Sequence, residues 1–128
     1  MKRPKKDAIV LDDDPAICSL VKLLAEEAGL DVEAFSDSLK FPSVYRTKTE
    51  LIVLDLNMPD IDGFEVCRKI KAIRDVPVIF VTGEQNPIIN EHMPQIVKTV
   101  GGLFYLGKPC DAQLLLKLIT DILDKQAD

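Results

Sequence analysis

Three short stretches of this 128-residue chain are apolar at every position: residues 8–11 (AIVL), 51–54 (LIVL) and 78–81 (VIFV). A strand with one face in water alternates apolar and polar residues, so stretches without alternation are typical of strands buried on both faces. Strands of this kind belong to parallel sheets that helices cover on each side. The stretches are far shorter than the about 20 residues that cross a bilayer, so we expect no membrane span.

Helical patterns and two weaker strands fill the intervals between these stretches. Apolar residues recur at helical spacing after Asp14 and Pro15, which suit a helix cap and a first helical residue, and Gly29 closes that helix. Five strands alternating with helices predict one α/β domain, a doubly wound five-stranded parallel sheet with helices on both faces and the flavodoxin-like order 2-1-3-4-5. The other predicted elements are strands at 32–35 and 103–106, helices at 64–73 and 114–123 (the latter capped by Asp111), and a short helix within 36–49 that Pro42 interrupts.

The charge of the chain is unevenly distributed. The sequence has 16 Lys and Arg against 21 Asp and Glu, a net charge of −5, yet four of the cations lie in the first six residues. We expect residues 1–7 to be a solvated basic tail, residues 8–124 to be a single domain and residues 125–128 to be a short C-terminal tail. The acidic body argues against nucleic acid as a partner of this domain.

The cysteines and the N-terminus indicate the cellular compartment in which we expect the protein. Cys18, Cys67 and Cys110 are odd in number, far apart and form no C-x-x-C pair, and only His92 could join them in a metal cluster. We therefore expect buried, reduced thiols in a cytoplasmic protein and no structural zinc site. The apolar stretch behind the basic start ends in three aspartates, so it does not resemble the core of a signal peptide.

Polar side chains follow the strands in a regular pattern. Asp12 and Asp13 come directly after the first strand, and Asp55 after the third. Thr82 ends the fourth strand, and Lys108 lies just after the fifth. In an open parallel sheet the carboxyl ends of the strands share one edge, and binding sites form there. The order 2-1-3-4-5 puts the second strand, which offers no comparable group, at the margin, so the five side chains are predicted to meet at one rim.

Three carboxylates at one rim need a cation. Two carboxylates about 4 Å apart repel by ~4 kcal/mol at an effective dielectric constant of about 20. Lys108 supplies one positive charge, which leaves two negative charges uncompensated. Oxygen ligands without histidine or cysteine favour Mg²⁺ ahead of Mn²⁺ or Ca²⁺. Together with Thr82 and Lys108 such an ion could bind a tetrahedral anion, and a carboxylate among them could attack phosphorus to give an aspartyl phosphate.

Four segments of the chain resemble the receiver domain of two-component response regulators. In the family's order they are IVLDDDPAI (9–17), LIVLDLNMPDIDGFEV (51–66), VIFVTG (78–83) and FYLGKP (104–109). They cover nearly the whole chain. The resemblance implies that Asp55 is the phospho-acceptor and that Asp12 and Asp13 hold Mg²⁺, Asp13 more directly. It also implies that the backbone carbonyl of Asn57 completes the metal shell.

The resemblance further implies a signalling cycle. Thr82 matches the hydroxyl that bonds the phosphoryl group, Lys108 its charge partner and Tyr105 the switch aromatic, while Lys108–Pro109 matches the family's cis peptide bond. The phosphoryl donor would be a phosphohistidine on a sensor histidine kinase or a histidine phosphotransfer protein. Phosphorylation would pull Thr82 inward, let Tyr105 turn into the vacated space and shift the face of helix four, strand five and helix five. The downstream effector is not identified. The domain would hydrolyse its own aspartyl phosphate slowly, without being a small-molecule phosphatase.

Several features leave alternatives open. Pro87 and Pro94 predict that residues 84–94 form a long loop, or a loop plus a displaced turn, before a shortened fourth helix, which puts the family's partner geometry in doubt. The chain could therefore be an interaction module that keeps the fold without phosphorylation, or form a homodimer through the altered helix. A phosphohydrolase acting on small phosphate esters would need an acid at the place of Asn57. Tyr105 suits a core aromatic equally well. The domain could also come from a longer multidomain regulator.

Overall fold

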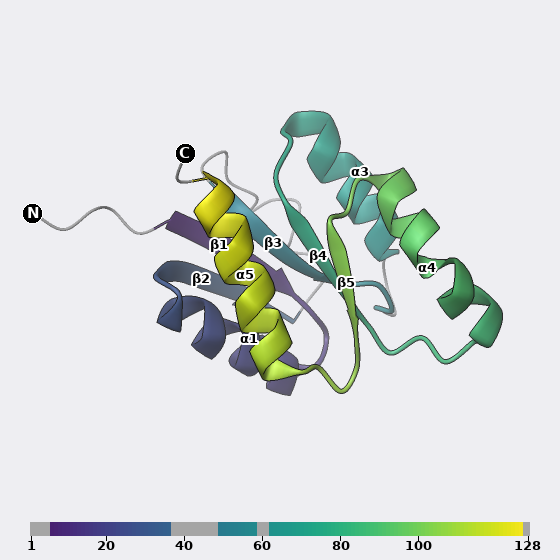
Figure 1. Cartoon of the computed structure of the whole chain (residues 1–128), viewed down its shortest axis with the longest axis horizontal. Coiled ribbons are helices and arrows are strands. Elements are labelled where there is room, and N and C mark those ends of the chain that lie inside the picture. Colours follow the sequence, from purple (N-terminus) through teal and green to yellow (C-terminus); the bar gives the residue numbers. More distant parts are fainter. Residues whose placement is uncertain (1–5, 37–48, 59–61, 127–128) are drawn as a thin grey trace, which may run out of the picture.

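The strands form a single five-stranded parallel sheet in the order β2-β1-β3-β4-β5, as the sequence predicts (Figure 1). The computed structural model describes residues 6–36, 49–58 and 62–126. The short helix predicted within residues 36–49 falls mostly outside these ranges. The strands are β1 (Lys6–Leu11), β2 (Leu30–Phe35), β3 (Thr49–Asp55), β4 (Val78–Thr82) and β5 (Phe104–Gly107).

Helices in the described part of the chain begin at polar caps. They are α1 (Pro15–Glu27), α3 (Gly63–Ile73), α4 (Pro87–Val100) and α5 (Ala112–Gln126). The Asp14 carboxylate accepts the backbone N–H of Ala16 at 2.9 Å, and Asp62 and Asp111 cap α3 and α5 in the same way. These bonds satisfy amides that have no acceptor inside the helix. The chain leaves α1 through Gly29, whose φ of +96° lies in the left-handed region that favours glycine.

The helices cover the sheet on both faces, with α1 and α5 on one side and α3 and α4 on the other (Figure 1). Neighbouring residues of a strand point to opposite layers, so Val10 packs toward α1 and α5 whereas Leu11 packs toward α3 and α4. Both side chains are fully buried. Burial on the two faces is the reason why these strands show no alternation of polar and apolar residues.

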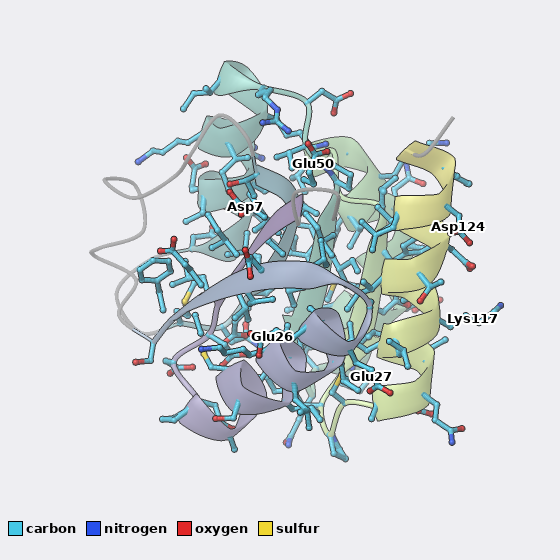
Figure 2. All side chains as sticks on the ribbon, turned by 90° about the vertical axis from the view of Figure 1, so that its left-hand side faces the viewer. Asp7, Glu26, Glu27, Glu50, Lys117 and Asp124 are labelled. Atoms are coloured by element: carbon cyan, nitrogen blue, oxygen red, sulfur yellow. The ribbon has the colours of Figure 1, made fainter. Side chains whose placement is uncertain are left out.

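The outer faces of the helices carry charge. Figure 2 shows exposed charged side chains on α1 and α5, among them Glu27, Lys117 and Asp124. Of the predicted apolar face of α3, Cys67 and Ile70 are buried, whereas Ile73, the last residue of the helix, is 65% exposed. Within the described residues, no helix combines the length and the apolar character that crossing a membrane requires.

The three cysteines are free thiols, as the sequence predicts. Cys18 and Cys67 are buried and Cys110 is partly buried. The Cys18 thiol donates to the backbone carbonyl of Asp12 at 3.2 Å, and the Cys67 thiol donates to a carbonyl at the end of α4. Burial raises the pKa of all three thiols, which keeps them protonated.

The prediction of a long loop over residues 84–94 is wrong, because α4 begins at Pro87 and continues to Val100. A proline suits the first helical position, since the N–H that it lacks would have no acceptor inside the helix. The side chain of Asn86 accepts the N–H of Ile88 at 2.9 Å and caps the helix. An Asn-Pro pair that resembles a loop signal is therefore the start of the helix.

Pro94 lies inside α4, where a proline removes one helical hydrogen bond and typically costs ~3 kcal/mol. On the side facing the sheet, α4 buries Met93, Val97 and Val100 in the core shared with α3. Each such burial contributes about 1.5–3 kcal/mol, so the packing of this stripe outweighs the cost of the proline. Tertiary contacts therefore override the local preference of the sequence.

Candidate functional site

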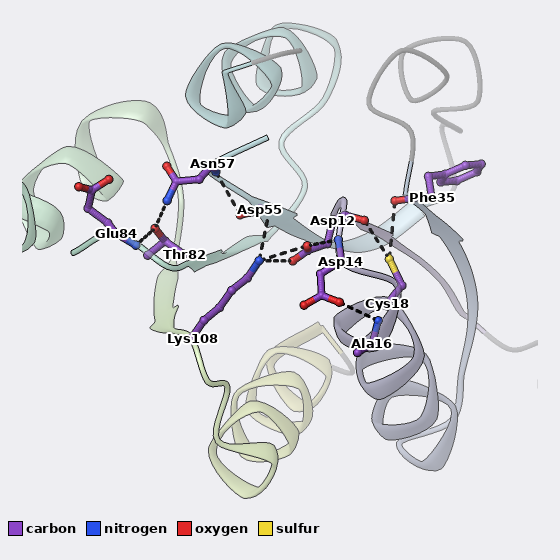
Figure 3. Close-up of polar contacts among 10 residues, drawn as sticks. All are labelled: Asp12, Asp14, Ala16, Cys18, Phe35, Asp55, Asn57, Thr82, Glu84 and Lys108. Carbon is purple, nitrogen blue, oxygen red and sulfur yellow. Dashed lines mark hydrogen bonds and ion pairs between the residues drawn. The ribbon is translucent and has the colours of Figure 1, made fainter. Parts of the chain in front are cut away.

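The carboxyl ends of β1, β3, β4 and β5 bring the predicted polar side chains to one rim of the sheet (Figure 3). Asp12 directly follows β1, and Asp55 and Thr82 are the last residues of β3 and β4. Lys108 directly follows β5 and extends its side chain toward both carboxylates. The parallel order of the strands thus assembles a site from residues that are up to 96 positions apart.

Main-chain hydrogen bonds continue past the strand ends and fix the backbone of this rim. The Lys108 N–H donates to the carbonyl of Thr82 at 2.8 Å, and the Leu56 N–H donates to the carbonyl of Val81 at 3.2 Å. The chain from Asp55 to Leu56 and the chain at Lys108 are therefore both tied to the end of β4. Side chains at the rim can turn, but their backbone positions are held by the sheet.

Asp12, Asp13 and Asp55 form an acidic cluster, in which one carboxylate oxygen from each lies within 4.8 Å of the others. Asp12 and Asp55 are each 1% exposed, whereas Asp13 is exposed to solvent. The Lys108 ammonium lies 3.2 Å from Asp12 Oδ1 and 3.4 Å from Asp55 Oδ2. One cation thus faces three carboxylates, two of which are shielded from water.

Burial and the neighbouring charges shift the pKa values of Asp12, Asp55 and Lys108. Burial raises the pKa of Asp12 from 3.8 to about 6, against the N–H of Asp14 that its carboxylate accepts at 2.9 Å. Burial also raises the pKa of Asp55, although the Asn57 N–H and the Lys108 ammonium act in the opposite direction. For Lys108, burial disfavours the charge, but the two neighbouring carboxylates outweigh it and raise the pKa of the ammonium. The lysine is therefore charged at neutral pH and does not fully compensate the acids.

The cluster fits a hard dication such as Mg²⁺. Asp12 Oδ2 is buried and accepts no hydrogen bond from the described residues, although the Lys108 ammonium is 3.2 Å away. A buried carboxylate oxygen without a hydrogen bond is costly in a folded protein and is the kind of atom that a metal ion would satisfy. Because the three groups are all oxygen donors and include no nitrogen or sulfur, they suit Mg²⁺ better than a softer metal.

Asn57 contacts two members of the site, Asp55 and Thr82. Its backbone N–H donates to Asp55 Oδ1 at 3.0 Å. Its side-chain amide donates to the hydroxyl oxygen of Thr82 at 3.1 Å, a contact across 25 positions that we did not predict. The Thr82 hydroxyl also accepts the N–H of Glu84 at 3.0 Å. The single signal in the sequence is an amide-bearing residue two positions after a rim aspartate, which does not specify this partner.

Tyr105 is not part of the acidic cluster. It lies on β5 with 37% of its surface exposed and lines a groove of about 470 Å³ between α4 and β5, together with Pro94, Val97 and Lys98. It is therefore not a core aromatic, and its role as a switch stays a prediction. The Lys108–Pro109 peptide bond is cis, as the resemblance to receiver domains implies.

The chain is similar to known signalling proteins in sequence. It matches the family described as the response regulator receiver domain over residues 8–120. It is 32% identical over 124 residues to the DNA-binding dual master transcriptional regulator RpaA of Synechocystis, and 32% identical over 114 residues to the response regulator protein TodT of Pseudomonas putida. These matches cover 90% and 86% of this chain and 48% of each relative, so the chain spans about half the length of these curated relatives.

The fold is similar to solved receiver domains. A receiver domain protein (CheY-like) of Methanospirillum hungatei is 26% identical with a TM-score of 0.82, and the match covers 97% of this chain and 98% of that one. The BeF3-activated receiver domain of DrrB, a Thermotoga maritima protein, is 25% identical with a TM-score of 0.83, and the match covers 94% of this chain and 99% of that one. With its 2-1-3-4-5 sheet and its acidic rim, the chain belongs to the response regulator receiver domains of two-component signal transduction.

Proposed function

We propose that this domain is a phosphorylation-dependent signalling switch in which Asp55 accepts a phosphoryl group from a phosphohistidine. The observation that carries the proposal is the position of the Asp55 carboxylate, which is buried at the rim beside a lysine and two further aspartates. Asn57 connects it to the Thr82 hydroxyl, because its N–H donates to Asp55 and its side-chain amide donates to Thr82. A receiver domain is a phospho-acceptor module and not a classical enzyme, and the arrangement supports Asp55 as its acceptor.

The transfer forms one bond and breaks one bond. A carboxylate oxygen of Asp55 attacks phosphorus, the P–N bond of the donor breaks, and its electron pair stays on the imidazole, which leaves with a proton. Lys108 holds a positive charge beside Asp55 Oδ2 and would compensate the charge that spreads over the phosphoryl oxygens. The Asn57 N–H orients the carboxylate through its other oxygen. A Mg²⁺ ion held by Asp12, Asp13, Asp55 and the Asn57 carbonyl would neutralise further charge on those oxygens. Slow hydrolysis by water would later restore the free carboxylate.

The product would change the rim, because an aspartyl phosphate places about −1.5 to −2 charges there. The Thr82 hydroxyl, which now only accepts hydrogen bonds from the described residues, keeps its proton free to donate to a phosphoryl oxygen. Movement of Thr82, followed by Tyr105, would shift the face of α4, β5 and α5 between two populations. A sensor histidine kinase or a phosphotransfer protein would supply the phosphoryl group. Because RpaA is named as a DNA-binding regulator, an effector of transcription is the first output to test.

Phosphorylation is tested directly with phosphoramidate, a small donor with a P–N bond, in the presence of Mg²⁺. We expect intact-mass analysis to show one added phosphoryl group that hydroxylamine removes, as an acyl phosphate requires. Asp55→Asn, which keeps the shape of the side chain without the nucleophile, should give no adduct. The same adduct on the Asp55→Asn protein would refute the assignment of Asp55.

The metal is tested by its effect on stability. A ligand that binds only the folded state at a hundred times its Kd stabilises that state by ~2.7 kcal/mol, so Mg²⁺ should raise the urea midpoint of the wild type. Asp13→Asn should remove most of this effect, because it takes one oxygen anion from the cluster. Asp14→Asn is the matched control, since Asp14 is the adjacent exposed helix cap and asparagine caps equally well. Equal Mg²⁺ responses in the two variants would contradict the metal site.

A further inference from the structure

The fourth helix consists of two parts that are held in different ways. All side chains of residues 87–92 are exposed, including Ile88 at 68% and Ile89 at 38%. The buried side chains of α4 begin at Met93, and the core contacts belong to the second part of the helix. Figure 1 shows the C-terminal end of α4 beside α3, while its N-terminal end projects away from the sheet. Packing therefore anchors only the second part of the helix.

Pro94 lies at the boundary between these parts. In a regular helix the N–H of residue 94 would donate to the carbonyl of Asn90, but proline has no N–H. The hydrogen-bond ladder is thus interrupted at the position where core packing begins. Sharp helix bends concentrate at prolines for this reason. The helix therefore lacks one of the hydrogen bonds that would hold its two parts in a fixed relative orientation.

The first part of α4 is tied to the functional rim by side-chain hydrogen bonds. The Asn90 amide donates to the carbonyl of Glu84 at 2.9 Å, and the Asn86 N–H donates to the Glu84 carboxylate at 3.1 Å. The N–H of Glu84 in turn donates to the Thr82 hydroxyl oxygen at 3.0 Å. Two hydrogen bonds thus connect the Thr82 hydroxyl to the first part of α4 through one residue.

We propose that residues 87–92 move as a separate unit, hinged between the buried Met93 and Pro94 and latched to Thr82 through Glu84 and Asn90. The event that would move this unit is the phosphorylation of Asp55, so this step rests on the function proposed above. When the Thr82 hydroxyl turns to an anionic oxygen on Asp55, its geometry toward the Glu84 N–H changes, and Glu84 carries Asn90 with it. The second part of α4 keeps its place in the core. The pair Ile88 and Ile89 then changes position relative to β5, which gives the domain an apolar tip that responds to phosphorylation.

The latch and the hinge are tested in the unphosphorylated protein by hydrogen exchange. Asn90→Ala removes the bond to Glu84 while raising helix propensity, so faster exchange cannot come from a poorer helix former. We expect residues 90–93 to exchange about fivefold faster, as follows from losing a hydrogen bond of ~1 kcal/mol, and residues 97–100 to stay unchanged. Glu91→Ala, an exposed neighbour on the same turn, is the matched control and should change neither. Equal acceleration along the whole helix in Asn90→Ala would overturn the latch.

Pro94→Ala restores the missing N–H and should slow exchange of residues 90–93 about fivefold, for the same reason. Unchanged exchange in this variant would overturn the hinge.

The response to phosphorylation is tested in wild type after the phosphoryl adduct has been verified by mass. A change confined to residues 84–93 supports it, and an equal change in residues 95–100, or none in residues 84–93, overturns it. If no adduct forms at all, the proposed function fails, whereas the two variants still decide whether α4 is divided.

Discussion

Replacing Asp12 by asparagine should stabilise the metal-free protein at pH 7 by ~3 kcal/mol. The pKa of this carboxyl is raised from 3.8 to about 6, so folding favours its neutral form. A shift of about two units corresponds to roughly 3 kcal/mol that the folded state loses when the group is ionised. Asparagine has nearly the same shape and can still accept the N–H of Asp14, but it carries no charge into the buried site. Lys108 keeps Asp55 as its partner.

The pH dependence follows with a definite sign. Because the folded pKa lies above the unfolded one, the destabilisation is absent below about pH 4, grows as the pH rises and is complete above about pH 6. Urea unfolding in EDTA should therefore show wild-type stability falling over this interval, and Asp12→Asn should flatten the decline. Asp14→Asn, an exposed cap, should stay within about 0.5 kcal/mol of wild type. A metal-free Asp12→Asn protein that is less stable than wild type at pH 7 would contradict the electrostatic description of the rim.

A methyl group added at Gly63 should disturb the site more than one added at Gly83, in the connection that follows Thr82. A Cβ atom on Gly63 would lie 2.5 Å from the carbonyl oxygen of Asp55 and 2.8 Å from the Cα of Leu56. Both are backbone atoms in a strand end that the sheet holds, so they cannot move aside. We expect Gly63→Ala to cost about 1–3 kcal/mol in the free energy of unfolding. Displacement of Asp55 should also slow phosphoryl incorporation, since a misplacement of ~1 Å can cost 10²-fold in rate.

Gly83→Ala is the matched control for this prediction. Gly83 follows Thr82, and a Cβ atom there would meet only the side chain of Lys108 at 3.8 Å, an ordinary van der Waals distance. We expect its urea midpoint and its rate of phosphoryl incorporation to remain near those of wild type. Similar losses in the two variants would mean that the sensitivity at position 63 does not come from the close approach to Asp55.

The sequence was most informative where burial and topology act together. Strands apolar on both faces predict a covered parallel sheet, and the shared edge of the strand ends then places Asp12, Asp55, Thr82 and Lys108 at one rim. The contact between the Asn57 amide and Thr82 could not be predicted in this way. It depends on how two side chains from neighbouring strand ends turn toward each other, and no local pattern in the sequence encodes that orientation.

The fourth helix shows the opposite case, in which capping and core packing override a local preference. Pro87 and Pro94 favour a loop on local grounds, although Pro87 suits a helix start after Asn86. The spacing of Met93, Val97 and Val100 is helical and agrees with the shortened fourth helix that the sequence predicts after residue 94. A proline argues strongly against a helix only where the N–H that it lacks would have an acceptor inside that helix, and where the burial of neighbouring side chains does not compensate for the loss.

The main-chain bonds beyond the strand ends have a consequence for how such a domain can evolve. Because the end of β4 is hydrogen-bonded to Leu56 on one side and to Lys108 on the other, the sheet fixes the backbone as far as Thr82, and the connection to α4 starts at Gly83. New outputs can then arise by altering the connection and the helix beyond this glycine, while the frame that positions the acids stays constant. Insertions or substitutions after residue 83 should accordingly change the output of the domain while leaving the acidic phospho-acceptor site intact.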